Sequence, residues 1–305
     1  MVNNPTVHLL GVASGVGASN QGCAHGPLAL QQHAEIFDNL PVHWVWENTI
    51  YPPEGQYSRL GAMEAVMDIS HRLAYEVHDF ITNNQKFAII GGDQSSSIGT
   101  WSGMAHALRK QGDIGLIWVD AHLDCHTPST TRTGNIHGMS MAHLLGYGET
   151  ALCSILDAEA KLLPSNICFI GIKRFDPAEM ELLEKLNIKV FFMKDVQEQG
   201  IHAVMQAAIE HVSRHTIGYG ISIDMECLET KDDTSMLSAE LIGIKAEAFI
   251  ESLSQLYIYP KLLGVEIAEF NPSSDSDNKV KIIIRDILKM LFLGPSAKKR
   301  KAKKI

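Results

Sequence analysis

The sequence predicts an α/β fold in which a parallel β-sheet is covered by helices on both faces. Short apolar runs with the composition of β-strands alternate with helix-like segments along the whole chain. Several of these runs are apolar almost throughout, which is typical of strands that are buried on both faces. No internal repeat and no Ser/Pro-rich linker interrupts the alternation, so we expect one α/β domain over residues 1–297 and a basic tail over residues 298–305.

The individual elements follow from this pattern in order. Strands are predicted at residues 6–12, 42–46, 87–90, 115–120, 166–171, 189–192, 218–224 and 262–268. The first predicted helix begins at Pro27, because proline is favourable at the first helical position. Further helices are predicted at residues 60–82, 96–110, 177–186, 202–215, 245–256 and 279–293.

Composition excludes several classes of protein. Of the 305 residues, 45% are hydrophobic and 20% are charged, which indicates a globular chain rather than a disordered or fibrous one. The net charge is −9, although six of the positive charges lie in the tail, so the rest of the chain carries −15. Such an acidic body is poorly suited to bind nucleic acid or an anionic membrane. The tail could be a binding or targeting tag, but we favour a solvated chain end.

Two further features suggest a cytoplasmic protein. The sequence contains no apolar run near the roughly 18 residues that a membrane span requires, and its first residues lack the basic stretch of a secretory signal. The five cysteines are an odd number and do not show the spacing of a metal finger. Reduced cysteines in the cytoplasm are therefore the simplest interpretation.

Polar side chains that could carry chemistry follow four of the predicted strands. Ligands of open α/β sheets bind at the carboxyl ends of the strands, so these side chains should meet at one edge of the sheet. They are Gln94 after the third strand, Asp120, His122 and Asp124 after the fourth, Asp224 and Glu226 at the end of the seventh, and Glu269 after the eighth.

The spacing of these residues predicts a metal site. Residues two apart in an extended chain point the same way, so Asp120, His122 and Asp124 can face one point, as can Asp224 and Glu226. Carboxylates with some imidazole suit Mn²⁺, and bridging carboxylates make a pair of ions plausible. The D-x-H-x-D pattern alone is weak evidence for a metal site, since such acids also serve as caps at the ends of strands. Four acids brought together would nevertheless repel one another without a cation.

Four ordered segments resemble the ureohydrolase family, and most of all the arginases within it. Residues 120–146 read DAHLDCHTPSTTRTGNIHGMSMAHLLG, and residues 222–226 read SIDME where the family has S-x-D-x-D. Residues 269–272 read EFNP, like the family's E-x-N-P, and residues 91–95 read GGDQS, like its G-G-D-H-S. Glycines of the family's opening loop are matched weakly near residues 15–27.

The resemblance implies a fold, an activity and a cofactor. The family's fold is a three-layer α/β/α domain with a mainly parallel eight-stranded sheet. Its members hold two Mn²⁺ ions, whose bound hydroxide attacks the guanidinium carbon of L-arginine or a related guanidino compound and releases urea. The expected partners are a small guanidino substrate and further copies of the chain, in a homotrimer or homohexamer.

Position by position, the resemblance also implies roles for individual residues. Asp120 and Asp224 match the carboxylates that bridge the two ions, Asp124 matches a ligand of the first ion, and His122 matches a ligand of the second. His137 matches a proton shuttle, and Glu269 matches the carboxylate that orients the guanidinium. The residues that match the site of the substrate's amino-acid end are His126, Thr131, Thr133, Asn135, Asp176 and Glu179.

Some of these positions allow a second interpretation or depart from the family. Asp176 followed by Pro177 is also typical of a helix N-cap, and both roles can hold. Gln94 stands where the family has a metal-binding histidine, and Glu226 stands where it has aspartate. An amide oxygen is a weaker ligand than imidazole, so metal affinity should fall. The sequence favours a metal-dependent amidinohydrolase, and the alternative is a degenerate homologue that serves as a binding or regulatory protein.

Overall fold

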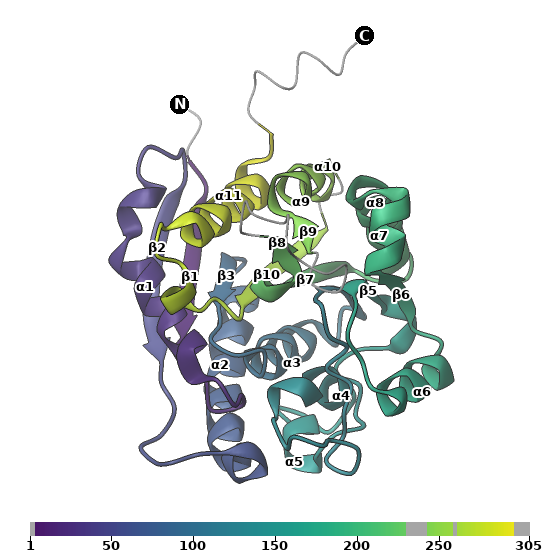
Figure 1. Cartoon of the computed structure of the whole chain (residues 1–305). Helices are drawn as coiled ribbons and strands as arrows, with labels where there is room; N and C mark the ends of the chain where they lie inside the picture. The colour runs from purple at the N-terminus through teal and green to yellow at the C-terminus, as the bar shows by residue number, and fades with distance from the viewer. Residues whose placement is uncertain (1–3, 230–242, 259–260, 296–305) are drawn as a thin grey trace.

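The computed structural model describes residues 4–229, 243–258 and 261–295 (Figure 1). Its centre is an eight-stranded sheet in which all paired strands are parallel, with the order β2-β1-β3-β10-β7-β4-β5-β6. All eight predicted strands are present in it: β1 Thr6–Val12, β2 His43–Ile50, β3 Lys86–Ile90, β4 Ile114–Val119, β5 Ile167–Ile172, β6 Lys189–Phe192, β7 Gly218–Asp224 and β10 Leu262–Ala268.

Helices cover both faces of this sheet, which confirms the three-layer α/β/α prediction (Figure 1). One face carries α2 Met63–Thr82, α3 Ser96–Leu108, α4 Ser140–Leu144, α5 Thr150–Cys153 and α6 Pro177–Leu186. The other carries α1 Gly26–Gln32, α7 Met193–Gln199, α8 Ile201–Val212, α9 Ala246–Ser252, α10 Ser254–Ile258 and α11 Lys279–Leu293.

Strand alternation divides the core into two parts, one on each side of the sheet. In β4, Leu116 and Trp118 belong to the core under α2 and α3, whereas Ile117 and Val119 belong to the core under α8 and α11. All four side chains are at most 1% exposed. Successive side chains of a strand point to opposite faces, so an interior strand must be apolar on both. This burial explains why the central strands lack a polar face in the sequence.

Several predicted boundaries were wrong in detail. The second strand continues to Ile50, and the residues before Met63 form a 3₁₀ turn rather than the first turn of α2. The helix predicted at 245–256 is divided into α9 and α10. The short helices α4, α5 and α7, and a second sheet made of β8 Leu228–Glu229 and β9 Ile244–Lys245, were not predicted.

The described residues include no helix long and apolar enough to cross a membrane. The basic tail over 298–305 lies outside the described residues. All five cysteines are free thiols.

Candidate metal centre and active site

One cavity of about 560 Å³ collects the predicted site residues. The loops around it follow β3, β10, β7, β4 and β5, which are consecutive neighbours in the sheet. Of the predicted residues, Asp120 is buried beside the cavity, and the others line it: Gln94, His122, Asp124, His126, Thr131, Thr133, Asn135, His137, Asp176, Glu179, Asp224, Glu226 and Glu269.

Three of these residues form a cluster that could hold a metal ion. Asp120, His122 and Asp224 each offer a ligand atom, and these atoms lie within 4.8 Å of one another. The carboxylate of Asp120 is held from both sides, because it accepts hydrogen bonds from Trp118 Nε1 at 3.0 Å and from the backbone N–H of His122 at 2.8 Å. Such support fixes the direction in which a ligand points before an ion arrives.

The acidic side chains around the cluster lie close together and lack enough positive charge nearby to balance them. Burial raises the pKa of Asp224 well above its usual value, and the negative charges of Asp120, Glu269 and Glu226 raise it further. The pKa of Asp124 is raised well above its usual value by burial and then by Asp120. Buried carboxylates that raise one another's pKa in this way are neutralised either by protons or by a cation. The donor set therefore fits a divalent metal.

Asp124 reaches the cavity by a route that differs from the extended chain expected from the sequence. Its φ angle is +50°, which is the left-handed region. The chain turns there, and the carbonyl of Asp124 accepts a hydrogen bond from the N–H of Met141 at 2.9 Å. Asp124 consequently lines the cavity but does not belong to the tight three-residue cluster.

Glu226 also departs from the expected extended geometry. The chain leaves β7 at Asp224 and enters a 3₁₀ turn over Met225–Cys227, in which the N–H of Glu226 bonds to Asp224 Oδ1 at 2.6 Å. Glu226 is therefore exposed and approaches the cavity from its rim, while Asp224 lies beneath it.

Gln94 lies at the base of the cavity and is 1% exposed. Its Nε2 donates to Ser222 Oγ at 3.0 Å, and its backbone N–H donates to Glu269 Oε1 at 2.9 Å. Its Oε1 is buried and has no hydrogen-bond partner among the described residues. Leaving a buried acceptor unpaired costs about 1–3 kcal/mol, which a bound cation would offset.

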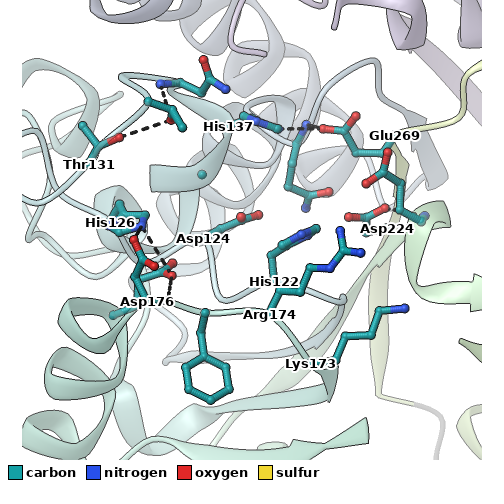
Figure 2. Close-up of a pocket in the computed structure, with 17 residues that line it drawn as sticks. His122, Asp124, His126, Thr131, His137, Lys173, Arg174, Asp176, Asp224 and Glu269 are labelled. Carbon is teal, nitrogen blue, oxygen red and sulfur yellow. Dashed lines mark hydrogen bonds and ion pairs between the residues drawn. The ribbon is translucent and has the colours of Figure 1, made fainter. Parts of the chain in front are cut away.

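His137 and Glu269 meet at the rim of the cavity (Figure 2). The distance between His137 Nδ1 and Glu269 Oε1 is 3.0 Å. The backbone N–H of His137 donates to the carbonyl of Gly17 at 3.1 Å, and the N–H of Gly17 donates to Asp93 Oδ2 at 2.8 Å. The glycine-containing opening loop thus supports the histidine. A Cβ at Gly17 would lie 2.8 Å from Asp93 Oδ1, so a larger residue would disturb this support.

A polar group of residues occupies the opposite end of the cavity from Asp224 and Glu269 (Figure 2). His126 Nε2 lies 3.5 Å from both Asp176 Oδ2 and Glu179 Oε2. Glu179 Oε2 also accepts from the backbone N–H of Asp176 at 2.9 Å, and Pro177 is the first residue of α6. Asp176 is therefore both the N-cap of α6 and a residue of the cavity wall.

Four residues of the cavity wall were missed by the sequence analysis: Gly138, Lys173, Arg174 and Phe175. The signal that could have found the last three is the one used elsewhere, because they directly follow strand β5. Arg174 forms an isolated parallel bridge with His122, and its charge works against protonation of that histidine. The cavity thus contains two cationic side chains beside its acids.

Comparison with known proteins decides the family. Residues 5–293 match the sequence profile of the arginase family. An arginase of Brevibacillus brevis is 30% identical over 306 aligned positions, which cover 95% of this chain and 98% of that protein.

The chain belongs to the arginase family.

Solved structures agree with this assignment. The arginase of Bacillus caldovelox superposes with a TM-score of 0.87 at 26% identity, over 96% of this chain and 99% of that one. Formimidoylglutamase of Bacillus subtilis shares the fold, with a TM-score of 0.73 at 18% identity over 95% of this chain and 88% of that one. The predictions of a ureohydrolase fold and of a hydrolase that acts on guanidino or amidine groups are confirmed.

Proposed function

We propose that this arginase-family protein is a manganese-dependent amidinohydrolase that releases urea from L-arginine or a closely related guanidino acid. The observation that carries the proposal is the cavity, which has an acidic cluster at one end and a polar group at the other (Figure 2). A guanidino acid has a cationic, planar end and an amino-acid end. The acidic end of the cavity suits the cationic guanidinium, and the polar end suits the amino-acid part.

The acidic end would hold the metal through Asp120, His122, Asp124 and Asp224, with Gln94 and Glu226 completing the ligand set at the base and rim. Oxygen-rich sites with some imidazole suit Mn²⁺. When bound, such ions lower the pKa of a water molecule and supply a nucleophile at neutral pH. The unpaired Oε1 of Gln94 and the raised pKa values of the buried acids support this donor set.

Glu269 and His137 would then act on the substrate itself. The carboxylate of Glu269 can accept two parallel hydrogen bonds from a guanidinium, which orients the carbon that is attacked. Glu269 Oε1 also accepts from His137 Nδ1, so the imidazole is held with Nε2 as its remaining proton-transfer atom. We assign to Nε2 the transfer of a proton to the amine that leaves the substrate.

The polar end would select the amino-acid part of the substrate. Thr131, Thr133 and Asn135 offer hydroxyl and amide groups to an α-carboxylate, and Asp176 offers a carboxylate to an α-ammonium group. The loop is held in place by hydrogen bonds between Asn135 and Ser19, at 2.8 and 3.0 Å. A ligand without a carboxylate, such as agmatine, would leave these groups unpaired.

Urea release from L-arginine by Mn²⁺-loaded protein tests the proposal, with agmatine as the competing substrate. We expect activity on L-arginine to fall about 100-fold or more in His137→Ala, because general acid–base groups contribute roughly that much. His143→Ala is the matched control, since His143 is a buried histidine outside the cavity. If no guanidino compound yields urea at saturating Mn²⁺, the proposal is wrong and the protein serves as a binding or regulatory homologue.

A further inference from the structure

A buried hydrogen-bond network lies directly behind Gln94. Its centre is Glu266 on β10, a carboxylate with no exposed surface. Oε1 of Glu266 accepts from Ser96 Oγ at 2.9 Å and from Thr100 Oγ1 at 3.0 Å. Oε2 accepts from Trp101 Nε1 at 3.1 Å and from Ser222 Oγ at 3.0 Å. Glu266 does not line the cavity, so its four hydrogen bonds cannot be explained by direct contact with a ligand there.

The chemistry of the donors sets the direction of each bond in this network. The indole N–H of Trp101 can only donate, so Oε2 of Glu266 must be an acceptor. Ser222 has one hydrogen, which it gives to the same Oε2, and its lone pairs are then free to accept. Gln94 supplies the matching donor, because its Nε2 lies 3.0 Å from Ser222 Oγ. The amide nitrogen of Gln94 therefore faces Ser222.

This arrangement leaves the amide oxygen of Gln94 on the other side. Oε1 is buried, has no partner among the described residues, and belongs to a side chain that lines the cavity beside the metal cluster. The main chain of Gln94 is also held, because its carbonyl accepts from Ser97 Oγ at 2.8 Å and from Ser140 Oγ at 3.0 Å. With the backbone held and the amide placed beside Ser222, what remains to be decided is whether the oxygen or the nitrogen of the amide faces Ser222.

We propose that Ser222, held by Glu266, is a positioning residue that keeps the oxygen of the Gln94 amide, rather than its nitrogen, directed at the metal. The inference rests on the proposed function, since it needs a cation in the cavity. An amide nitrogen carries two hydrogens and no available lone pair, so the opposite orientation would repel a cation. The network thus makes glutamine a usable neutral oxygen ligand where the family motif has a histidine.

The test is the Mn²⁺ affinity of the full chain, measured by titration with electron paramagnetic resonance detection of free Mn²⁺. We choose pH 8, because burial raises the pKa of Glu266 to about 7 and the carboxylate is then ionised. Ser222→Ala should weaken binding by about tenfold or more, as expected when a group that orients a metal ligand is lost. Ser102→Ala is the matched control, because Ser102 is a buried serine whose hydroxyl has no partner among the described residues.

Two further variants separate positioning from a merely structural role. In a Gln94→Ala background, Ser222→Ala should have no further effect on affinity, because the group that it positions is gone. Glu266→Gln should keep affinity close to that of the unaltered protein, since Trp101 still requires an oxygen at the Oε2 position. Glu266→Leu removes that oxygen and should weaken Mn²⁺ binding as Ser222→Ala does.

The outcomes are distinct. Unchanged affinity in Ser222→Ala, or an equal loss in the Gln94→Ala background, would overturn the positioning role while leaving the proposed function in place. If the unaltered protein bound no Mn²⁺, both the positioning role and the metal chemistry of the proposed function would be overturned. A crystal structure of the Mn²⁺-loaded protein would show Oε1 of Gln94 on the ion if the proposal is correct.

Discussion

The imidazole of His137 and the carboxylate of Glu269 are hydrogen-bonded at 3.0 Å, although the two residues are 132 positions apart in the sequence. Glu269 has a φ angle of +59°, and its Oε1 also accepts from the backbone N–H of Gln94. The pair therefore links the loops after β3 and β10 with the loop that contains residues 120–146.

This contact predicts how His137 titrates in the metal-free protein. Burial works to lower the pKa of His137, but the hydrogen bond and negative charge of Glu269 outweigh it and raise the pKa above its usual value. Glu269→Gln should therefore lower the pKa, which a proton NMR titration of the His137 ring would measure. Asp93 and Asp120 also raise it and remain in the variant.

Glu35→Gln is the control for this experiment, because Glu35 contacts His33, neither residue lines the cavity, and Glu269 stays in place. If the pKa of His137 were unchanged in Glu269→Gln, the assigned contact between the two side chains would be wrong.

Replacing Asp224, an acid of the metal cluster, should stabilise the metal-free protein but remove the stabilisation that bound metal provides. Burial and neighbouring acids raise the pKa of Asp224, so the folded metal-free protein loses stability as the pH rises above the usual aspartate range. Asp224→Asn removes this loss and should stabilise the metal-free protein at pH 7 by on the order of 1 kcal/mol. It should also abolish the stabilisation that Mn²⁺ gives the unaltered protein. Thermal unfolding with and without Mn²⁺ measures both.

The exposed Asp38 offers the matched substitution, since Asp38→Asn changes the same functional group outside the cavity. Equal responses of the two variants to Mn²⁺ would argue against a metal at Asp224.

The charge of Arg174 should oppose cation binding. The hydrogen bond to Asp120 raises the pKa of His122 above its usual value, and the charge of Arg174, which lines the same cavity, works against that rise. Because Arg174 is exposed, its effect is screened, and Arg174→Gln should tighten Mn²⁺ binding only about two- to fivefold. The gain should shrink at high salt. Arg132→Gln is the control, because the Arg132 side chain is 77% exposed and approaches Asp176 instead.

A second charged cluster, whose residues do not line the cavity, should matter for stability alone. Asp157 accepts from the buried Lys161 at 2.8 Å, from Arg109 at 3.0 Å and from His106 at 2.8 Å. Although burial opposes it, these partners lower the pKa of Asp157 to about 2. The stability that Asp157 contributes is therefore complete above pH 4 and is lost as the pH falls towards 2.

Asp157→Ala leaves the ammonium of Lys161 buried without its carboxylate, so it should cost about 2–4 kcal/mol at pH 7. Glu159→Ala should cost less than about 1 kcal/mol, because the Glu159 side chain is 73% exposed. Urea denaturation measures both values, and similar losses in the two variants would refute the assigned role of Asp157.

The site could be predicted well because its residues directly follow apolar strands. In the D-x-H-x-D segment and at Asp224, the apolar strand and the polar residues at its end are both visible within a few positions of sequence. The structure places these polar side chains together. The directions of Asp124 and Glu226 could not be predicted in this way. Both residues lie where the chain turns out of its strand, so the alternation of extended chain no longer applies.

Local pattern also failed for short elements. Helices α4, α5 and α7 span seven residues or fewer, which is too short for a helical period to stand out. Their formation depends on packing against the sheet and on neighbouring loops. Lys173 and Arg174 were also overlooked, although both directly follow β5, where Arg174 pairs with His122 in an isolated parallel bridge.

The sequence by itself determined which segments form strands and which polar residues stand at their carboxyl ends, because both follow from local hydrophobic pattern. Tertiary structure alone decided the order of the strands, in which β10, the last strand of the large sheet, lies between β3 and β7. Main-chain hydrogen bonds are alike for every apolar strand, so local sequence does not select neighbours. Packing of both faces selects them, and it thereby brings Glu269 beside Gln94 and His137.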